Sequence, residues 1–210
     1  METKLSSEIH LENLLQRAPA LASCRDSILN AFTLLRHSFR AQGKLLICGN
    51  GGSAADAEHW AGELLKGFCR KRPLDAMART KLPALLADGL QGALPVIPLT
   101  GFPAFTSAFA NDESPELAFA QLAWGLGNPH DVFVGISTSG NARNVCAAAQ
   151  AARARGLATI ALTGELGGAL RPLCDVAICV PARETYLVQE LHLPIYHCLS
   201  LMLEDEFFAS

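Results

Sequence analysis

The sequence lacks the features of nucleic-acid-binding proteins and of membrane proteins. Its formal net charge is −3, and its longest basic cluster is only Arg70-Lys71-Arg72, which we interpret as ordinary surface charge. No apolar run approaches the length that spans a bilayer, and the segment from Met1 to Glu12 is too polar for a signal peptide. These absences predict a cytoplasmic protein with neither a nucleic-acid nor a membrane partner.

Cys-x-x-Cys motifs, internal repeats and low-complexity tracts are also absent. The seven cysteines are odd in number and scattered, and several lie inside apolar patterns, so we expect free, buried thiols in a reducing compartment. The chain has 210 residues, half of them hydrophobic, which is enough for one domain with a large core, with or without an appendage.

The first 41 residues predict a helical arm ahead of a main unit at 42–210. Apolar stripes at helical spacing run through residues 6–41, and Pro19 is expected to divide them into two helices. The arm must bury these stripes either on its own chain or on a partner subunit.

From residue 44 the pattern alternates between strand and helix. Short apolar runs predict strands at 44–48, 94–99, 131–136, 157–162 and 176–180. Helical patterns lie at about 53–68, 114–126, 141–155 and 184–207. Continuous apolar strands with crossover helices are typical of an α/β fold with a five-stranded, parallel, doubly wound sheet. The stretch 73–93 has no firm period and is interpreted as a helix plus a long loop near the site.

The first predicted strand runs into a glycine-rich loop, Gly49-Asn50-Gly51-Gly52-Ser53. Its glycines permit positive φ and a close approach to a ligand, and Ser53 can cap the helix that follows. Free N–H groups at a helix start attract an anion. The loop has neither the Gly-Lys-Ser/Thr ending of a nucleotide P-loop nor the GxGxxG dinucleotide pattern. It predicts either a phosphate-binding loop or a tight turn without a ligand.

A second loop, 137–141, holds three successive hydroxyl groups on Ser137, Thr138 and Ser139. Hydroxyls and backbone amides together form a neutral phosphate cradle that requires no Lys or Arg. The alternative is a helix cap, but three hydroxyls exceed what a cap needs, so we favour phosphate. Both loops follow the carboxyl ends of predicted parallel strands, where doubly wound sheets bind their ligands.

Two pairs of polar residues are predicted to share helix faces. His59 and Glu63 are four residues apart, about 40° around a helix, and could share a metal or a proton; a surface pair is the alternative. Gln189 and His197 are eight apart, about 80° around the last helix, and could reach one cavity. Pro194 between them predicts a kink, which leaves the direction of His197 open.

Together these motifs resemble the sugar isomerase (SIS) domain family, and within it the phosphoheptose isomerases. The matching segments run in order from about residue 10 to about residue 205, and as a set they are highly specific. They are Cys-Gly-Asn-Gly-Gly-Ser (48–53), His59-x3-Glu63, Asn111-Asp112, Gly-Ile-Ser-Thr-Ser-Gly-Asn (135–141), Leu-Thr-Gly (162–164) and Gln189-Glu-x-His-x4-His197. The resemblance implies a homotetramer with active sites at subunit boundaries. It also implies conversion of sedoheptulose 7-phosphate to D-glycero-D-manno-heptose 7-phosphate.

The resemblance also implies a role for each matching residue. Substrate contacts are implied at Asn50, Gly51, Gly52, Ser53, Glu63, Asn111, Asp112 and Gln189, and at the phosphate cradle of Ser137, Thr138 and Ser139. A zinc ion is implied at His59, Glu63, Gln189 and His197. Glu63 and His197 match the family's acid/base pair, in which Glu63 would move the carbon-bound proton and His197 the oxygen-bound protons. Zinc could stabilise the enediolate, although a zinc-bound carboxylate is a weaker base, which sets the two roles of Glu63 in tension.

Some positions depart from the family pattern. Ala142 stands where the isomerases usually have a substrate-contacting serine, and a basic contact is expected to have moved to Lys66 or Arg70. The segment 73–93 is longer than the family's loop. Two alternatives therefore stand beside the isomerase: a non-catalytic SIS-domain binding protein of the replication-initiator-associating type, and an isomerase or sensor for another sugar phosphate. A scaffold has no need of four convergent donors, which favours the isomerase.

Overall fold

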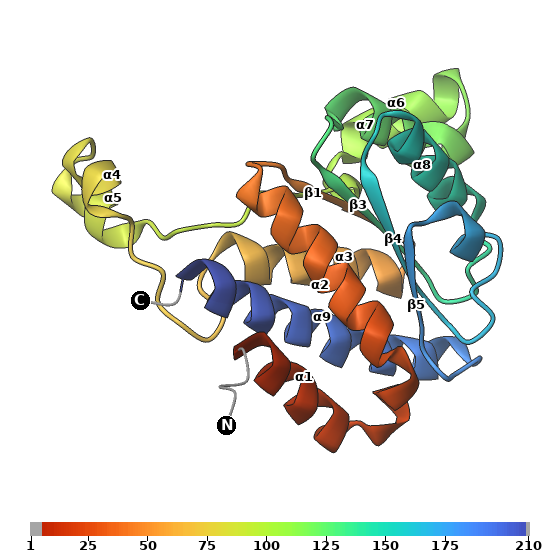
Figure 1. Ribbon diagram of the computed structural model, residues 1–210. Helices are drawn as coiled ribbons and strands as arrows, with labels where there is room; N and C mark the ends of the chain where they lie inside the picture. Colours follow the sequence, from red (N-terminus) through yellow and green to blue (C-terminus); the bar gives the residue numbers. More distant parts are fainter. Residues whose placement is uncertain (1–5, 209–210) are drawn as a thin grey trace.

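A single sheet of five parallel strands organises the molecule (Figure 1). The computed structural model describes residues 6–208. The strands are β1 Leu45–Cys48, β2 Val96–Pro98, β3 Val132–Ser137, β4 Ala158–Thr163 and β5 Val176–Cys179, in the order β2-β1-β3-β4-β5. The predicted five-stranded parallel sheet is confirmed, and every strand end lies within two residues of the prediction.

Helices cover both faces of the sheet (Figure 1). One face carries α1 Ser6–Arg17, α2 Arg25–Arg40, α3 Gly52–Leu65 and α9 Thr185–Phe208; the other carries α6 Pro103–Asp112, α7 Ala118–Leu126 and α8 Arg143–Ala154. Along β1, Leu45 and Ile47 enter the first layer, whereas Leu46 and Cys48 enter the second. Because each strand is buried on both faces, its sequence is a continuous apolar run rather than an alternation.

The N-terminal helices bury their apolar stripes within this chain. Pro19 opens a short 3-10 helix, η1 Pro19–Cys24, which separates α1 from α2 as predicted. Leu11 of α1 and Phe32 of α2 belong to the same buried cluster as residues of the sheet and of α9. Of the two predicted burial sites, the structure shows the one within the chain. The domain boundary between residues 41 and 42 stays a prediction.

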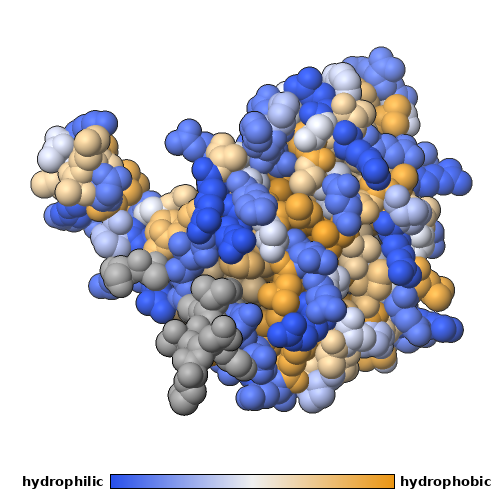
Figure 2. Space-filling view, viewed as in Figure 1, coloured by the Kyte–Doolittle hydropathy of each residue, from blue (hydrophilic) through white to orange (hydrophobic). Residues whose placement is uncertain are grey.

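The segment 73–93 forms a hairpin of two short helices, α4 Ala76–Thr80 and α5 Ala84–Gly89. A bridge between Pro73 and Gln91 closes its base, and the hairpin projects away from the body (Figures 1 and 2). Its exposed apolar side chains include Met77 and Leu85, which are 70% and 84% exposed. The predicted helix with a long loop near the site was therefore wrong.

Helix α6 was missed by the sequence prediction, which placed its helix only at 114–126. Pro103 occupies the start of α6, and the 3-10 helix η3 Pro115–Leu117 separates α6 from α7. The remaining short helices are η2 Leu99–Gly101 and η4 Arg171–Leu173. Across residues 6–208, no helix combines the length and apolar character needed to cross a membrane.

Candidate functional site

The two predicted phosphate loops meet at the point where the strand order reverses. After β1 the chain moves to one edge of the sheet, and after β3 it moves to the other. Asn50 of the first loop and Asn144 of α8 exchange two side-chain hydrogen bonds of 2.9 and 2.8 Å. This amide pair ties the first loop to the helix that follows the second. In doubly wound sheets, ligands bind in the crevice at such a switch point.

The first loop turns through a positive φ of 54° at Gly51, a conformation that favours glycine. Helix α3 therefore begins at Gly52, and its N-cap is Gly51, without a side-chain cap. The predicted capping role of Ser53 was wrong, because Ser53 already lies in the first turn and is 4% exposed. A Cβ atom on Gly52 would lie 2.3 Å from Nε2 of Gln189, so the Gln189 amide packs directly on this loop.

The hydroxyl-rich loop after β3 does not cap the next helix. Ser137 ends the strand, and the Ser139 hydroxyl accepts a 3.1 Å hydrogen bond from the amide of Asn141. Helix α8 begins later, with Ala142 as an N-cap that makes no side-chain hydrogen bond. The Thr138 and Ser139 hydroxyls thus lie between the strand and the helix, whereas Ser137 is the last strand residue and is 5% exposed. The phosphate cradle stays a prediction.

A cavity of about 490 Å³ lies beside the first loop, within the size range of small-molecule sites. Asn50 and Gly51 line it together with Thr106 and Ser107 of α6, and the buried Thr100 hydroxyl on its wall has no hydrogen-bond partner. The predicted substrate residues Asn111 and Asp112 lie exposed at the end of α6, outside this lining. Asn111 Nδ2 donates to Asp112 Oδ1 over 2.9 Å.

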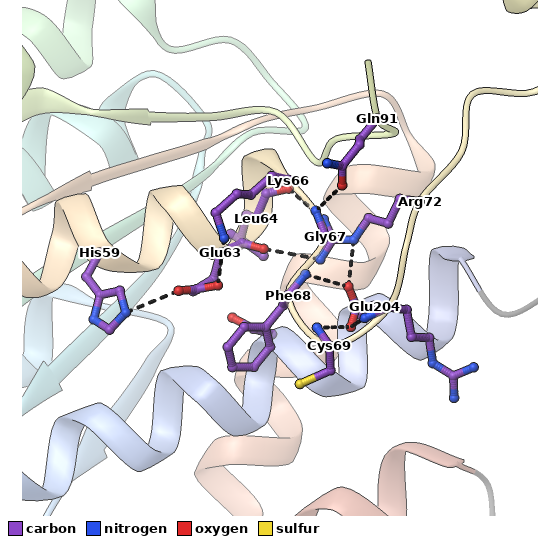
Figure 3. Close-up of polar contacts among 12 residues, drawn as sticks. His59, Glu63, Leu64, Lys66, Gly67, Phe68, Cys69, Arg72, Gln91 and Glu204 are labelled. Atoms are coloured by element: carbon purple, nitrogen blue, oxygen red, sulfur yellow. Dashed lines mark hydrogen bonds and ion pairs between the residues drawn. The ribbon is translucent and has the colours of Figure 1, made fainter. Parts of the chain in front are cut away.

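Helices α3 and α9 bring together three of the four predicted zinc-binding residues. His59 Nε2 lies 3.2 Å from Glu63 Oε1, and Lys66 Nζ lies 3.5 Å from Glu63 Oε2 (Figure 3). The rings of His59 and His197 meet edge to face, with centroids 5.2 Å apart. The Glu63 side chain is 14% exposed, whereas that of His59 is 46% exposed. Gln189, the fourth, lies at the first loop instead.

Two side chains that sequence reasoning missed hold the other nitrogen of His59. The Tyr196 hydroxyl lies 2.9 Å from His59 Nδ1 and donates a 3.2 Å hydrogen bond to Asp56 Oδ1. Tyr196 is fully buried and stacks on Trp60, with centroids 5.8 Å apart. Two spacings in the sequence could have revealed these residues: Asp56 precedes His59 by three residues, and Tyr196 follows Gln189 by seven.

Burial dominates the electrostatics of this cluster. It lowers the pKa of His197, and nearby His59 lowers it further, while the Glu63 carboxylate opposes both. Burial and the neighbouring Asp56 raise the pKa of Tyr196, so that its hydroxyl keeps its proton. Burial also raises the pKa of Asp56, against the opposing effects of Tyr196 and His59. His197 is therefore neutral near pH 7 and carries a free lone pair.

The chemistry of these donors suits zinc. Two imidazoles and one carboxylate are common zinc ligands, and the buried Nε2 of His197 has no hydrogen-bond partner. However, between residues 6 and 208 no group of three or more His, Cys, Asp or Glu side chains is arranged to hold a metal ion. The donor types therefore fit, and zinc stays a prediction.

The segment after α3 is fixed by a buried ion pair. Arg72 Nε lies 2.8 Å from Glu204 Oε1, and Glu204 also accepts from the backbone amides of Phe68 and Cys69 (Figure 3). Lys66 and Arg70 were the two basic residues expected near the substrate, and Lys66 Nζ lies 3.5 Å from Glu63 Oε2. Arg70 instead pairs with Asp205, 2.9 Å away on α9.

Sequence comparison places these features in a known family. Profiles of the SIS domain match residues 11–85 and 111–203. A phosphoheptose isomerase from Roseiflexus sp. (strain RS-1) is 35% identical over 207 residues, covering 99% of this chain and 92% of that protein. This chain belongs to the phosphoheptose isomerase family of SIS-domain proteins. The resemblance predicted from the motifs is confirmed.

Other phosphoheptose isomerases agree in sequence and in fold. The protein from Thiobacillus denitrificans is 43% identical over 169 residues, which are 79% of this chain and 76% of that protein. The structure of a phosphoheptose isomerase from Francisella tularensis matches with a TM-score of 0.76 and 29% identity, covering 94% of this chain and 96% of that one. The structure of the Neisseria gonorrhoeae phosphoheptose isomerase matches with a TM-score of 0.73 and 31% identity, over 92% and 94%.

Within this phosphoheptose isomerase family member, the predicted site residues on and beside α3 form two groups. The first group lies at the switch point, where Asn50, Gly51, Gly52 and Gln189 meet. The second lies farther along α3 at His59, with Glu63 and His197 beside it. His59 follows Gly52 by seven residues, or about 10 Å of helix.

Proposed function

We propose that this protein is an aldose–ketose isomerase that converts sedoheptulose 7-phosphate to D-glycero-D-manno-heptose 7-phosphate. The observation that carries the proposal is the contact of Glu63 with His59, beside the ring of His197, on the helix that starts at the first phosphate loop. Membership of the phosphoheptose isomerase family supports the same substrate.

In the proposed reaction a proton moves between two adjacent carbons through an enediol. Glu63 would carry this proton, because its carboxylate is the side-chain base at the centre of the cluster and is still 14% exposed. Neutral His197 would exchange protons with the substrate oxygens, which is a role that imidazole performs near pH 7. Lys66, 3.5 Å from Glu63, would place a positive charge near the developing negative charge.

Zinc is part of this proposal. His59, Glu63 and His197 would hold it, with Gln189 as the predicted fourth ligand, and when bound it would act as a Lewis acid on the oxygens of the reacting carbons. Two imidazoles and a carboxylate support this choice, together with the unpartnered Nε2 of His197.

We also propose a homotetramer with active sites at subunit boundaries. His59 is 46% exposed on the single chain, so one side of the candidate site is open for another subunit to cover. Light scattering should give a mass near four times the 22.4 kDa of one chain. A monomer at micromolar concentration would refute the shared site.

Proton NMR of sedoheptulose 7-phosphate in heavy water tests the reaction. Purified protein, with and without added zinc, should bring deuterium to the carbon beside the carbonyl and produce the aldose. Dependence of this exchange on zinc would support the metal as well. No exchange by folded, zinc-supplied protein would favour a binding protein, or an isomerase of another sugar phosphate.

The matched variants are Glu63→Gln and Glu58→Gln. Glu58 is an exposed glutamate on the same helix, so its variant controls for the loss of a charge from α3. Glu63→Gln should abolish exchange, with a loss of at least about 10²-fold, while keeping the fold. Glu58→Gln should retain the parent rate. Appreciable turnover by Glu63→Gln would reject Glu63 as the base.

A further inference from the structure

One buried hydroxyl group contacts Nδ1 of His59, the ring nitrogen that does not face Glu63. The Tyr196 oxygen lies 2.9 Å from His59 Nδ1 and 3.2 Å from Asp56 Oδ1. Its ring is fully buried, stacked on Trp60, and in edge contact with the His59 ring at a centroid distance of 5.5 Å. The packing therefore fixes where this hydroxyl lies.

The hydroxyl has one proton to donate and two neighbours that could receive it. The hydrogen bond between Tyr196 and Asp56 runs from the Tyr196 hydroxyl to Asp56 Oδ1 at 3.2 Å, whereas Asp56 Oδ2 is buried and has no hydrogen-bond partner among the described residues. The Tyr196 proton therefore goes to Asp56. The Tyr196 oxygen then accepts from His59, which requires the proton of a neutral His59 ring to lie on Nδ1.

This assignment leaves a lone pair on the other ring nitrogen. His59 Nε2 faces Glu63 Oε1 at 3.2 Å, so two acceptors point toward one another in the neutral state. Such a pair is favourable only when a cation or a proton lies between them. A histidine held by its second nitrogen, with its lone pair presented beside a carboxylate, has the arrangement of a metal ligand with a supporting hydrogen bond.

We propose that Tyr196, supported by Asp56, is a positioning residue that fixes His59 in the Nδ1–H tautomer and so presents the Nε2 lone pair to the space beside Glu63. The consequence for turnover rests on the proposed isomerase function. The tautomer itself does not, because it is a property of the protein without substrate or metal. The opposite arrangement has a protonated Asp56 donating to Tyr196 and Tyr196 donating to His59, and it would place the ring proton on Nε2.

Long-range 1H–15N NMR of metal-free protein with 15N-labelled histidine distinguishes these two arrangements. At about pH 8.5 ordinary histidines are neutral, and the two tautomers have different nitrogen shifts. The His59 signals are identified by their loss in His59→Gln. The parent protein should show the Nδ1–H tautomer. A dominant Nε2–H tautomer in the parent would overturn the proposal.

Two substitutions test the roles of the partners. Tyr196→Phe keeps the ring and its packing but removes the hydroxyl, so the His59 tautomer should shift toward Nε2–H. Asp56→Ala removes the acceptor at Tyr196, which frees the Tyr196 proton for His59 and should also produce Nε2–H. Asp56→Ala leaves the buried ring untouched and thus serves if Tyr196→Phe does not fold. An unchanged tautomer in a folded variant would refute the proposal.

Tyr186→Phe is the matched control, because Tyr186 is the only other tyrosine and is 61% exposed. By isothermal titration, Tyr196→Phe should bind zinc 10- to 100-fold more weakly, as expected when the supporting hydrogen bond of a metal-bound histidine is removed. Tyr186→Phe should bind zinc as the parent does. In the kinetic assay Tyr196→Phe should lower kcat with little change in KM, because the phosphate loops are intact. Equal zinc affinity in the two variants would count against the proposal.

The outcomes separate this inference from the proposed function. If the tautomer is as expected but the parent protein does not turn over the sugar phosphate, the positioning role holds and the isomerase assignment fails. If the parent turns over the substrate and Tyr196→Phe keeps both its tautomer and its kcat, the isomerase stands and the positioning role is wrong.

Discussion

Replacing Glu204 by glutamine should destabilise the protein strongly, because Glu204 is the charged partner of a buried ion pair. Its Oε1 atom lies 2.8 Å from Nε of Arg72, and the two side chains are 1% and 0% exposed. Glu204 also accepts hydrogen bonds of 2.9 to 3.0 Å from the backbone amides of Phe68, Cys69 and Arg70. One carboxylate therefore satisfies three consecutive backbone amides in the turn that follows α3.

The magnitude follows from what the substitution leaves behind. Removing one charge of a buried pair costs about 3–5 kcal/mol, because the remaining charge stays desolvated. Arg72 cannot leave easily, since it also donates to the carbonyls of Leu64 and Glu63 at the end of α3. A glutamine can keep one accepting oxygen, but its amide nitrogen would then face backbone donors. We expect a loss of about 4 kcal/mol, a large share of the stability of a typical domain.

The pH dependence of the effect gives an independent check. Burial alone would raise the pKa of Glu204, but the amides of Phe68 and Cys69, together with Arg72, hold it below its usual value. A pKa that is lower in the folded state stabilises the protein above the unfolded pKa, about 4.3 for glutamate, and this stabilisation is lost as pH falls through the folded value. The difference between the parent and Glu204→Gln should therefore shrink below about pH 4.

Urea unfolding followed by circular dichroism measures both effects. Glu206→Gln is the control, because Glu206 lies two residues along the same helix and pairs with Arg40, whose side chain is 60% exposed. An exposed pair of this kind contributes about 0–1 kcal/mol. A loss of less than about 1 kcal/mol for Glu204→Gln at pH 7 would refute the reasoning.

Two further predictions concern backbone conformation and acid stability. Gly140→Ala should lower stability by at least about 1–3 kcal/mol in thermal unfolding, because φ is +68° and the new Cβ would lie 2.1 Å from the carbonyl oxygen of Gly167; an unchanged Tm would contradict this. Burial lowers the pKa of His192 to about 4. Between that pH and the ordinary histidine pKa of about 6.5, His192 is protonated in the unfolded chain but neutral in the folded one. Stability should fall by about 3 kcal/mol as pH drops from about 6.5 to about 4, and His192→Gln should remove that part of the slope.

The sequence predicted the sheet well, because burial on both faces leaves an unmistakable pattern. Each strand is a short apolar run, and the loops after β1 and β3 fall where a doubly wound sheet binds its ligands. Helix α6 was not predicted because Pro98, Gly101 and Pro103 are typical of a loop. Pro103 is in fact a helix-start signal, since its fixed φ suits the first helical position.

The candidate site was predictable only where its geometry is local. The contact of His59 with Glu63 follows from a spacing of four within one helix, and the structure forms it at 3.2 Å. The Ser53 cap was predicted wrongly because the positive φ at Gly51 places the N-cap at Gly51, two residues earlier. The Arg72–Glu204 pair joins residues 132 positions apart, which no local pattern reveals.

The contacts missed on α9 follow from the register between two parallel helices. Gln189 packs on Gly52 near the start of α3, and Tyr196 bonds to His59 farther along. Gln189 and Tyr196 are seven residues apart on α9, and Gly52 and His59 are seven residues apart on α3. Residues seven apart lie within about 20° of one another around a helix, so the two contacts use one stripe of each helix. At eight residues from Gln189, His197 lies about 80° off that stripe, which places Tyr196 directly against α3 and His197 at its edge. A slip of one residue between these helices would rotate the stripe by about 100° and break the loop contact and the His59 contact together. The first-loop end and the His59 end of the candidate site therefore depend on one helix pairing, and neither can change its register alone.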